Sequence, residues 1–166
     1  MARLVLVGLP GTGKTTVARE LAAVWHVRAV DTDDLVSVAT GVTVPTYLRE
    51  HGEEQFRRRE YAALVEALET DGVVSTGGGV VTLEAARRAL ASSMTLWLDC
   101  ANEDILARVG ESDRPLLGED PAGSLVRLRA RREPWYREVS RARIDASGPV
   151  AEVVSRIVDE LAKATA

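Results

Sequence analysis

A glycine-rich octapeptide near the amino terminus has the composition of a phosphate-binding loop. Residues 8–15 read Gly-Leu-Pro-Gly-Thr-Gly-Lys-Thr, which matches the pattern G-x-x-x-x-G-K-[ST] at every position. Its glycines let backbone N–H groups point at phosphate oxygens, and a lysine at this spacing can reach the β- and γ-phosphates. A purely structural turn would need neither the lysine nor the final hydroxyl. We therefore predict that nucleotide phosphates contact Gly11, Thr12, Gly13, Lys14, Thr15 and Thr16.

Carboxylates follow an expected strand at residues 28–30, in the run Asp31-Thr32-Asp33-Asp34. Ligands bind at the carboxyl ends of parallel strands, and these side chains would lie there beside the phosphate loop. One carboxylate could hold the water shell of a Mg²⁺ ion ligated by the loop hydroxyl, while another accepts a hydrogen bond from a substrate hydroxyl. The same residues could instead cap a helix that begins near Leu35. The sequence leaves both interpretations open.

Three consecutive glycines follow another expected strand at residues 73–75, in the run Thr76-Gly77-Gly78-Gly79. Glycine lets backbone N–H groups approach a ligand with no side chain between them. A flexible turn is the structural alternative, and only the wider context decides between the two.

Three arginines stand where a guanidinium could meet an anion: Arg57 in an expected helix, Arg114 before Pro115, and Arg137 after Trp135-Tyr136. Exposed arginines are usually only solvated. An arginine in a proline-bearing loop that faces a nucleotide, however, is the kind of residue that stabilises a transferring phosphoryl group.

Apolar runs and amphipathic stretches alternate along the chain and predict how these residues are positioned. The runs are apolar on both faces, as in a parallel sheet covered by helices on each side. The alternation predicts a P-loop α/β fold of three layers, α/β/α, around a central, mostly parallel five-stranded sheet. Residues 110–123 are expected to form a mobile lid. Strands are expected at residues 4–7, 28–30, 73–75, 95–98 and 143–145, and helices at residues 15–24, 53–68, 83–90, 103–109, 125–132 and 150–161.

Composition narrows the class of protein. The 166 residues, 46% apolar and 28% charged, fit one globular domain over residues 1–166. The net charge of −4 argues against nucleic-acid binding, although seven arginines and two acids between residues 127 and 143 create a positive field suited to a small anion.

The single cysteine, Cys100, excludes an internal disulfide and is expected in the core. There is no signal-peptide pattern and no apolar stretch of roughly 20 residues, so we expect a cytoplasmic protein with no membrane partner. No long exposed apolar stripe indicates an obligate partner, so we expect a monomer.

Taken together and in this order, the motifs resemble those of the shikimate kinases of the P-loop nucleoside-monophosphate-kinase-like superfamily. The resemblance extends from Leu4 to about Ile157. It implies that the γ-phosphoryl group of ATP is transferred to the 3-hydroxyl of shikimate, on the pathway to chorismate and aromatic amino acids, with Mg²⁺ as cofactor. The motifs that carry it are the phosphate loop, Asp31-Thr32-Asp33, Gly52-Glu53-x-x-Phe56-Arg57-x-x-Glu60, the triple glycine and Arg114-Pro115-Leu116-Leu117.

The resemblance also implies a shikimate site within a substrate-binding region at about residues 33–61. Asp33 matches the aspartate that bonds substrate hydroxyls and assists their deprotonation. Arg57 and Arg137 match the pair that grips the shikimate carboxylate, a role suited to the bidentate guanidinium. Gly78 matches a backbone contact to shikimate, in a wall shaped by Gly77 and Gly79.

For the nucleotide, the resemblance implies that Asp31 and Thr15 hold Mg²⁺, the aspartate largely through water. Arg114 matches an arginine of the lid, about residues 110–123, that closes over the phosphates. Arg108 and Pro149 lie near positions that flank the adenine.

Leu48 departs from the family pattern, which has an aromatic residue beside the shikimate ring at this position. The adjacent Tyr47 is rotated by about 100° around a helix and is not expected to substitute. Two alternatives remain: a related P-loop kinase of another hydroxylated acid, such as gluconate, or a nucleotide-binding regulator without turnover. The arginine pair and Arg114-Pro115-Leu116-Leu117 argue against the first, and the complete set of catalytic positions argues against the second.

Overall fold

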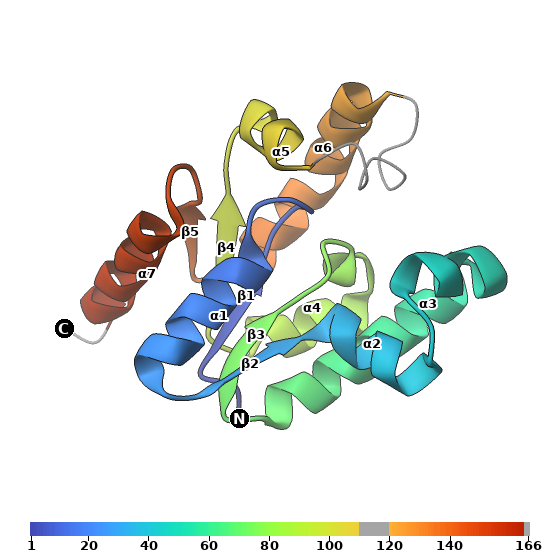
Figure 1. Ribbon diagram of the computed structural model, residues 1–166, viewed down its shortest axis with the longest axis horizontal. Coiled ribbons are helices and arrows are strands. Elements are labelled where there is room, and N and C mark those ends of the chain that lie inside the picture. Colours follow the sequence, from blue (N-terminus) through green and yellow to red (C-terminus); the bar gives the residue numbers. More distant parts are fainter. Residues whose placement is uncertain (110–119, 165–166) are drawn as a thin grey trace.

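In the computed structural model, which describes residues 1–109 and 120–164, the strands form one five-stranded sheet (Figure 1). They are β1 (Leu4–Val7), β2 (Arg28–Asp31), β3 (Gly72–Ser75), β4 (Thr95–Asp99) and β5 (Ala142–Asp145). Their order across the sheet is β2-β3-β1-β4-β5, and every neighbouring pair is parallel. This topology confirms the predicted P-loop α/β fold.

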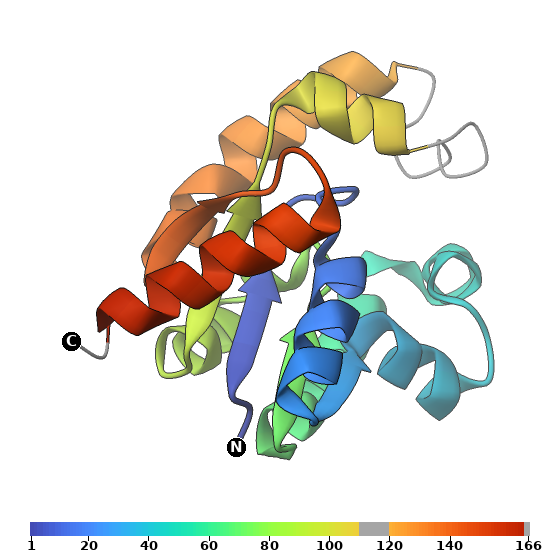
Figure 2. The same cartoon turned by 60° about the vertical axis from the view of Figure 1, so that its left-hand side comes forward.

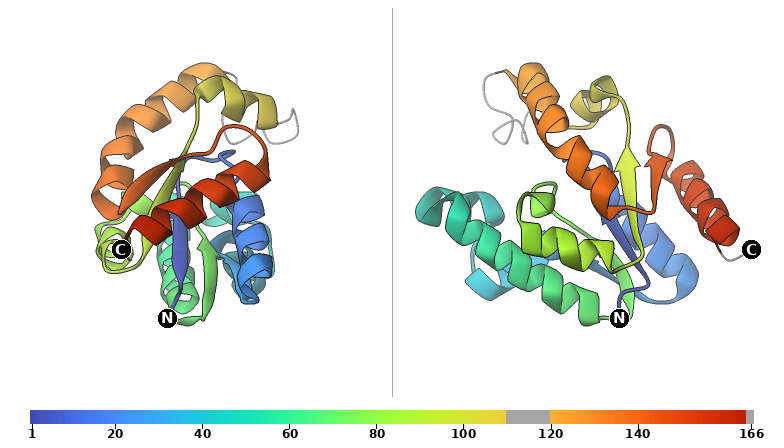
Figure 3. Two further views of the ribbon diagram at one scale, coloured as in Figure 1. Left: turned by 90° about the vertical axis from the view of Figure 1, so that its left-hand side faces the viewer. Right: turned by 180° about the vertical axis from the view of Figure 1, so that it is seen from behind.

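Helices cover both faces of the sheet (Figure 2 and Figure 3). Helices α1 (Lys14–Trp25) and α7 (Val150–Ala164) pack together on one face, and α3 (Val44–Glu69), α4 (Glu84–Ala91) and α6 (Pro121–Val139) cover the other. Three further elements complete the described chain: α2 (Thr32–Thr40), α5 (Asn102–Arg108) and the 3-10 turn η1 (Val80–Thr82). None of the helices within residues 1–109 and 120–164 has the length and apolarity needed to cross a bilayer.

The three central strands, β1, β3 and β4, are buried along their whole length, as their continuous apolar runs predict. β2 is different. It lies at the edge of the sheet, where it pairs with β3, and Arg28 and Ala29 are exposed. The prediction of a buried strand at residues 28–30 is therefore wrong at these two positions, because an edge strand is shielded on one side only. Cys100, directly after β4, is buried in the core as predicted.

The segment between β2 and β3 is more helical than the sequence pattern predicts. Helix α2 begins at Thr32, slightly before the start near Leu35 that the capping alternative predicts, and α3 begins at Val44 instead of residue 53. A bend divides α3 at Gly52, whose φ of 79° lies in the left-handed region that glycine adopts easily. Pro45 stands in the first turn, where its missing N–H costs no hydrogen bond, and the Thr43 side chain accepts from the Thr46 N–H.

Helix α6 is longer than the predicted segment 125–132. It begins at Pro121, after Asp120, whose carboxylate accepts a hydrogen bond from the Gly123 N–H at 2.9 Å. Residues 121–123 are therefore helix and not lid, and the rest of the predicted lid, except Asp120, lies outside the described residues. At its other end the helix continues through Pro134, which cannot donate a backbone hydrogen bond. Burial of the Tyr136 side chain, two residues later, offsets this cost.

All five strands point the same way, so the loops that follow them meet at one edge of the sheet. The phosphate loop follows β1, the carboxylate run begins at the end of β2, and the triple glycine follows β3. Segments far apart in sequence are thus brought to a common edge, where the predicted site lies.

Candidate active site

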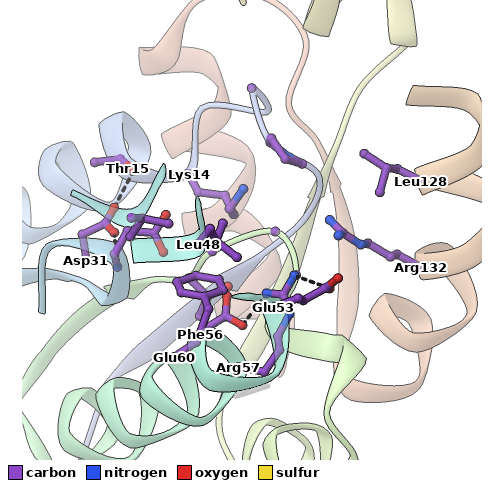
Figure 4. Close-up of a pocket in the computed structure, with 18 of the residues that line it drawn as sticks. Lys14, Thr15, Asp31, Leu48, Glu53, Phe56, Arg57, Glu60, Leu128 and Arg132 are labelled. Atoms are coloured by element: carbon purple, nitrogen blue, oxygen red, sulfur yellow. Dashed lines mark hydrogen bonds and ion pairs between the residues drawn. The ribbon is translucent and has the colours of Figure 1, made fainter. Parts of the chain in front are cut away.

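A cavity of about 590 Å³ opens at this edge of the sheet (Figure 4). The phosphate loop forms its floor, and the triple glycine forms one wall. Helix α3 contributes Phe56, Arg57 and Glu60, and α6 contributes Leu128 and Arg132 from the other side. With Asp31 and Asp33, at and just after the end of β2, five separate segments of the chain converge on one space.

Lys14 lies buried in the phosphate loop, at the first position of α1. Its ammonium group donates a hydrogen bond to the Leu9 carbonyl at 2.8 Å, and the Thr12 hydroxyl donates to the same oxygen at 2.9 Å. Burial lowers the pKa of Lys14 to about 8, against the opposing effect of Asp33 and Asp31. The loop thus holds a desolvated cation at the amino terminus of a helix, where an anion binds best.

Oxygen donors gather beside this loop. The Thr15 hydroxyl donates to a carboxylate oxygen of Asp31 at 2.7 Å and lies 3.2 Å from the Ser75 hydroxyl. The other oxygen of Asp31 accepts from the Asp33 N–H at 2.9 Å and caps α2. The capping interpretation is therefore confirmed, and the same aspartate faces the loop hydroxyl, where binding of a metal ion stays a prediction. Mg²⁺ prefers hydroxyl, carboxylate and water oxygens, so this donor set fits that ion.

Asp33 projects into the cavity beside the glycine wall. Its Oδ1 atom is buried and has no hydrogen-bond partner among the described residues. Burial, followed by the nearby charge of Asp31, raises the pKa of Asp33 to about 6. A buried carboxylate oxygen without a partner indicates a ligand that donates a hydrogen bond, such as a hydroxyl.

Arg57 and Glu60 form a pair one helical turn apart on α3. The guanidinium lies 2.6 Å from the almost fully buried Glu60 carboxylate and 3.3 Å from Glu53, over the ring of Phe56. Burial raises the pKa of Glu60 to about 7 even though Arg57 opposes the shift. Glu60 is the last residue of the motif that begins at Gly52, but the sequence analysis assigns it no role. Its role as a buried partner of Arg57 is visible only once the fold is known.

The glycine wall is shaped by its neighbours. A Cβ atom on Gly79 would collide with the Arg57 guanidinium, and one on Gly78 would lie 2.7 Å from the ring of Pro10. At Gly77, a Cβ atom would lie 2.6 Å from Glu60 and 2.8 Å from Asp33. Glycine is required most strictly at Gly78, because the Pro10 ring and backbone cannot move aside as the ends of the Arg57, Glu60 and Asp33 side chains can.

Arg132, and not Arg137, is the arginine of α6 that lines the cavity. The Arg137 side chain is 71% exposed and pairs with Glu133 at 2.9 Å. Five residues along a helix correspond to a rotation of about 140°, so the two arginines cannot face the same side. The Tyr136 hydroxyl donates to the Gly78 carbonyl, and Arg132 lies one turn before Tyr136 on that face. The assignment of Arg137 to the substrate site is therefore corrected to Arg132. The position of Arg132 four residues before the aromatic Tyr136, on the same face of the helix, was the signal in the sequence that could have identified it.

A second cavity of about 330 Å³ lies on the opposite side of the phosphate loop. Arg108 lines it and donates to the Thr12 carbonyl at 3.3 Å and the Ala146 carbonyl at 2.8 Å. Pro149 is not among its lining residues, although Gly148 and Val150 on either side of it are. The two segments that the sequence analysis places near the adenine, at Arg108 and around Pro149, thus border one cavity, and their contact with a base stays a prediction.

Leu48 lines the main cavity, whereas Tyr47 packs in a separate small core with Val36, Phe56 and Ala63. Tyr47 therefore does not replace the aromatic residue expected at position 48. Arg114, with the Arg114-Pro115-Leu116-Leu117 motif, lies outside the described residues.

Comparisons with known proteins agree with this geometry. A sequence model of the shikimate kinase family matches residues 10–162. A shikimate kinase from Corynebacterium jeikeium is 40% identical over 148 residues, which cover 88% of this chain and 80% of that protein. A shikimate kinase from Mycobacterium leprae is 42% identical over 148 residues, covering 87% and 74%.

Solved structures give the same result. The shikimate kinase from Acinetobacter baumannii in complex with shikimate has a TM-score of 0.91 at 33% identity, and the match covers 96% of this chain and 92% of that one. A gluconokinase from Sinorhizobium meliloti has a TM-score of 0.59 at 15% identity, covering 98% and 92%. At that identity the likeness to the gluconokinase shows a shared fold alone.

Proposed function

This chain belongs to the shikimate kinase family, and on that premise we propose how its residues transfer the γ-phosphoryl group of ATP to the 3-hydroxyl of shikimate. One observation carries the proposal. Three buried polar atoms without a partner among the described residues, Asp33 Oδ1, Arg57 Nε and Arg132 Nε, belong to side chains that line one cavity beside Lys14. Shikimate offers a carboxylate for the two guanidinium groups and hydroxyls for the aspartate.

At the shikimate end of the cavity, Arg57 and Arg132 hold the substrate carboxylate between α3 and α6. Two guanidinium groups recognise a carboxylate through charge-assisted hydrogen bonds of defined direction. Glu60 holds Arg57 in place at 2.6 Å, and the Gly78 backbone lies against the substrate ring. This arrangement turns the 3-hydroxyl toward the phosphate loop.

At the phosphate end, the loop amides and Lys14 hold the β- and γ-phosphates of ATP. Thr15 and Asp31 would hold Mg²⁺, the aspartate through water, and the ion would supply positive charge to the phosphate oxygens. Asp33 has a pKa of about 6 and is therefore mostly ionised at neutral pH, so it can accept the proton of the 3-hydroxyl as the phosphoryl group arrives. We assign Arg114 to charge stabilisation over the phosphates and Arg108 to the adenine.

The decisive test is ADP release from MgATP in the presence of shikimate, gluconate or a nucleoside monophosphate. We expect strong stimulation by shikimate alone, because neither of the others presents one carboxylate and a ring hydroxyl at the spacing of this cavity. Stimulation by gluconate instead would assign another substrate to the same fold. ATP binding without stimulation by any acceptor would favour the regulatory alternative and contradict the proposal.

Nucleotide affinity is expected to fall as the pH rises through about 8. Because burial lowers the pKa of Lys14 to about 8, the free protein loses this charge above that pH, whereas bound phosphates favour the charged form. The dissociation constant of ADP, measured by calorimetry without Mg²⁺, should rise roughly eightfold from about pH 7.5 to 9. In a Lys14→Met variant the constant should be higher and nearly independent of pH. If the dissociation constant of ADP rose equally with pH in both proteins, a group other than Lys14 would be responsible for the pH dependence.

We also propose that the protein works as a monomer in the cytoplasm. The exposed large apolar valines of the described residues lie on five different helices. They include Val24, Val38, Val65, Val126 and Val158.

A further inference from the structure

An ionic cluster around a buried carboxylate lies at the end of β4, outside the catalytic cavity. Asp99, the last residue of that strand, has a side chain that is 1% exposed. Arg129 of α6 lies 2.7 Å from its Oδ1 atom. Arg143 of β5 lies 2.7 Å from Oδ2, as an ion pair without hydrogen-bond geometry, and stacks over the ring of Trp97. We call Asp99, Arg129 and Arg143 the Asp99 cluster.

Arg129 uses every nitrogen of its guanidinium in this cluster. Nη1 binds Asp99, Nε donates to the Asn102 side chain at 2.8 Å, and Nη2 donates to the Cys100 carbonyl at 2.6 Å. The three partners lie at the end of β4 and the start of α5. Because the guanidinium is planar and rigid, three bonds in different directions fix both the position and the rotation of α6 at this point.

Helix α6 presents an adjacent face to the cavity, because Arg129 and Arg132 lie only about 60° apart around the helix axis. Leu128 and Arg132 line the cavity (Figure 4). Tyr136 of the same helix donates to the Gly78 carbonyl. Arg132 follows Arg129 by less than one helical turn, so a shift of the helix at Arg129 moves Arg132 with it. A buried ion pair adds little net stability compared with apolar packing. We therefore expect the main effect of the Asp99 cluster to be on the position of α6.

We propose that Arg129 is a positioning residue for the kinase reaction: by anchoring α6 to Asp99, Cys100 and Asn102, it holds the Arg132 guanidinium opposite Arg57. This inference rests on the proposed role of Arg132 at the shikimate carboxylate. An arginine displaced by about 1 Å no longer meets a carboxylate bound by a second arginine, so the loss falls on shikimate and not on ATP.

The test is steady-state kinetics of Arg129→Met with each substrate varied in turn. We expect the KM for shikimate to rise about tenfold and the KM for ATP to stay within about twofold. Arg131→Met is the matched control, because Arg131 is an exposed arginine of the same helix, and it should leave both constants unchanged. Equal changes in the two KM values for Arg129→Met would overturn the inference.

Arg129→Lys separates positioning from folding. It keeps a positive charge beside Asp99, but one ammonium group cannot hold three partners in fixed directions. We expect a melting temperature close to that of the wild type together with a raised KM for shikimate. A wild-type KM in this folded variant would overturn the inference, even if Arg129→Met failed to fold.

A double-mutant cycle with Arg132→Ala decides whether Arg129 acts through Arg132. Once Arg132 is gone, adding Arg129→Lys should raise the KM for shikimate by less than about twofold. The same fold increase in both backgrounds would overturn the positioning role and leave the proposed function intact. If Arg132→Ala itself leaves the KM for shikimate unchanged, the proposed carboxylate site fails, and this inference fails with it.

Discussion

Replacing Lys14 with alanine is expected to lower kcat by about three orders of magnitude. The ammonium group is the buried cation of the phosphate loop, and no other lysine or arginine of the described residues belongs to that loop. Transition-state charge on the transferring phosphoryl group would then lack its nearest fixed counter-charge. The measurement is single-turnover ADP formation at saturating MgATP and shikimate.

Lys163→Ala is the matched control for this experiment, because Lys163 is an exposed lysine of α7 that pairs with Glu160. It should turn over like the wild type, and both variants should keep the wild-type circular dichroism spectrum. Turnover of Lys14→Ala within about tenfold of the control would contradict the assigned role of Lys14.

Truncating Arg132 to alanine is expected to raise the KM for shikimate by a factor of roughly 30 to 900. This corresponds to the loss of about 2–4 kcal/mol that follows removal of one partner from a buried charge pair. The KM for ATP should change little, because neither Arg57 nor Arg132 belongs to the phosphate loop. Initial rates with each substrate varied measure both constants.

Arg137→Ala is the control, since Arg137 lies on the same helix and is exposed to solvent. Its kinetic constants should stay close to wild type. If Arg137→Ala raised the KM for shikimate and Arg132→Ala did not, the carboxylate site derived from the structure would be wrong. Arg57→Ala should also weaken shikimate binding, although it leaves Glu60 buried without its partner, so Arg132 gives the clearer result.

Short-range patterns in the sequence determined the catalytic framework. The phosphate loop needs glycines, a lysine and a hydroxyl within eight residues, and this spacing carries its chemistry without reference to the rest of the chain. The central strands were equally predictable, because apolar runs such as residues 4–7 and 73–75 can only be buried. The family motifs then gave the substrate and the reaction.

The tertiary structure decided which long-range neighbours each side chain meets. Arg132 and Arg137 look alike in sequence, and only the packing of Tyr136 against Gly78 turns one toward the cavity. Glu60 became a buried partner of Arg57 because the glycine wall covers it. These outcomes depend on the rotation of a helix about its own axis.

Contacts between distant segments also account for the features of the fold that local sequence patterns did not predict. Helix α6 runs through Pro134, which is locally unfavourable, because contacts with distant strands outweigh the local cost. β2 is partly exposed because strand order, which no local pattern encodes, places it at the edge. The Asp99 cluster joins β4, β5 and α6 across 44 positions from Asp99 to Arg143. Local spacing thus determined the chemistry of this protein, whereas packing between distant segments decided which side chains are positioned to perform it.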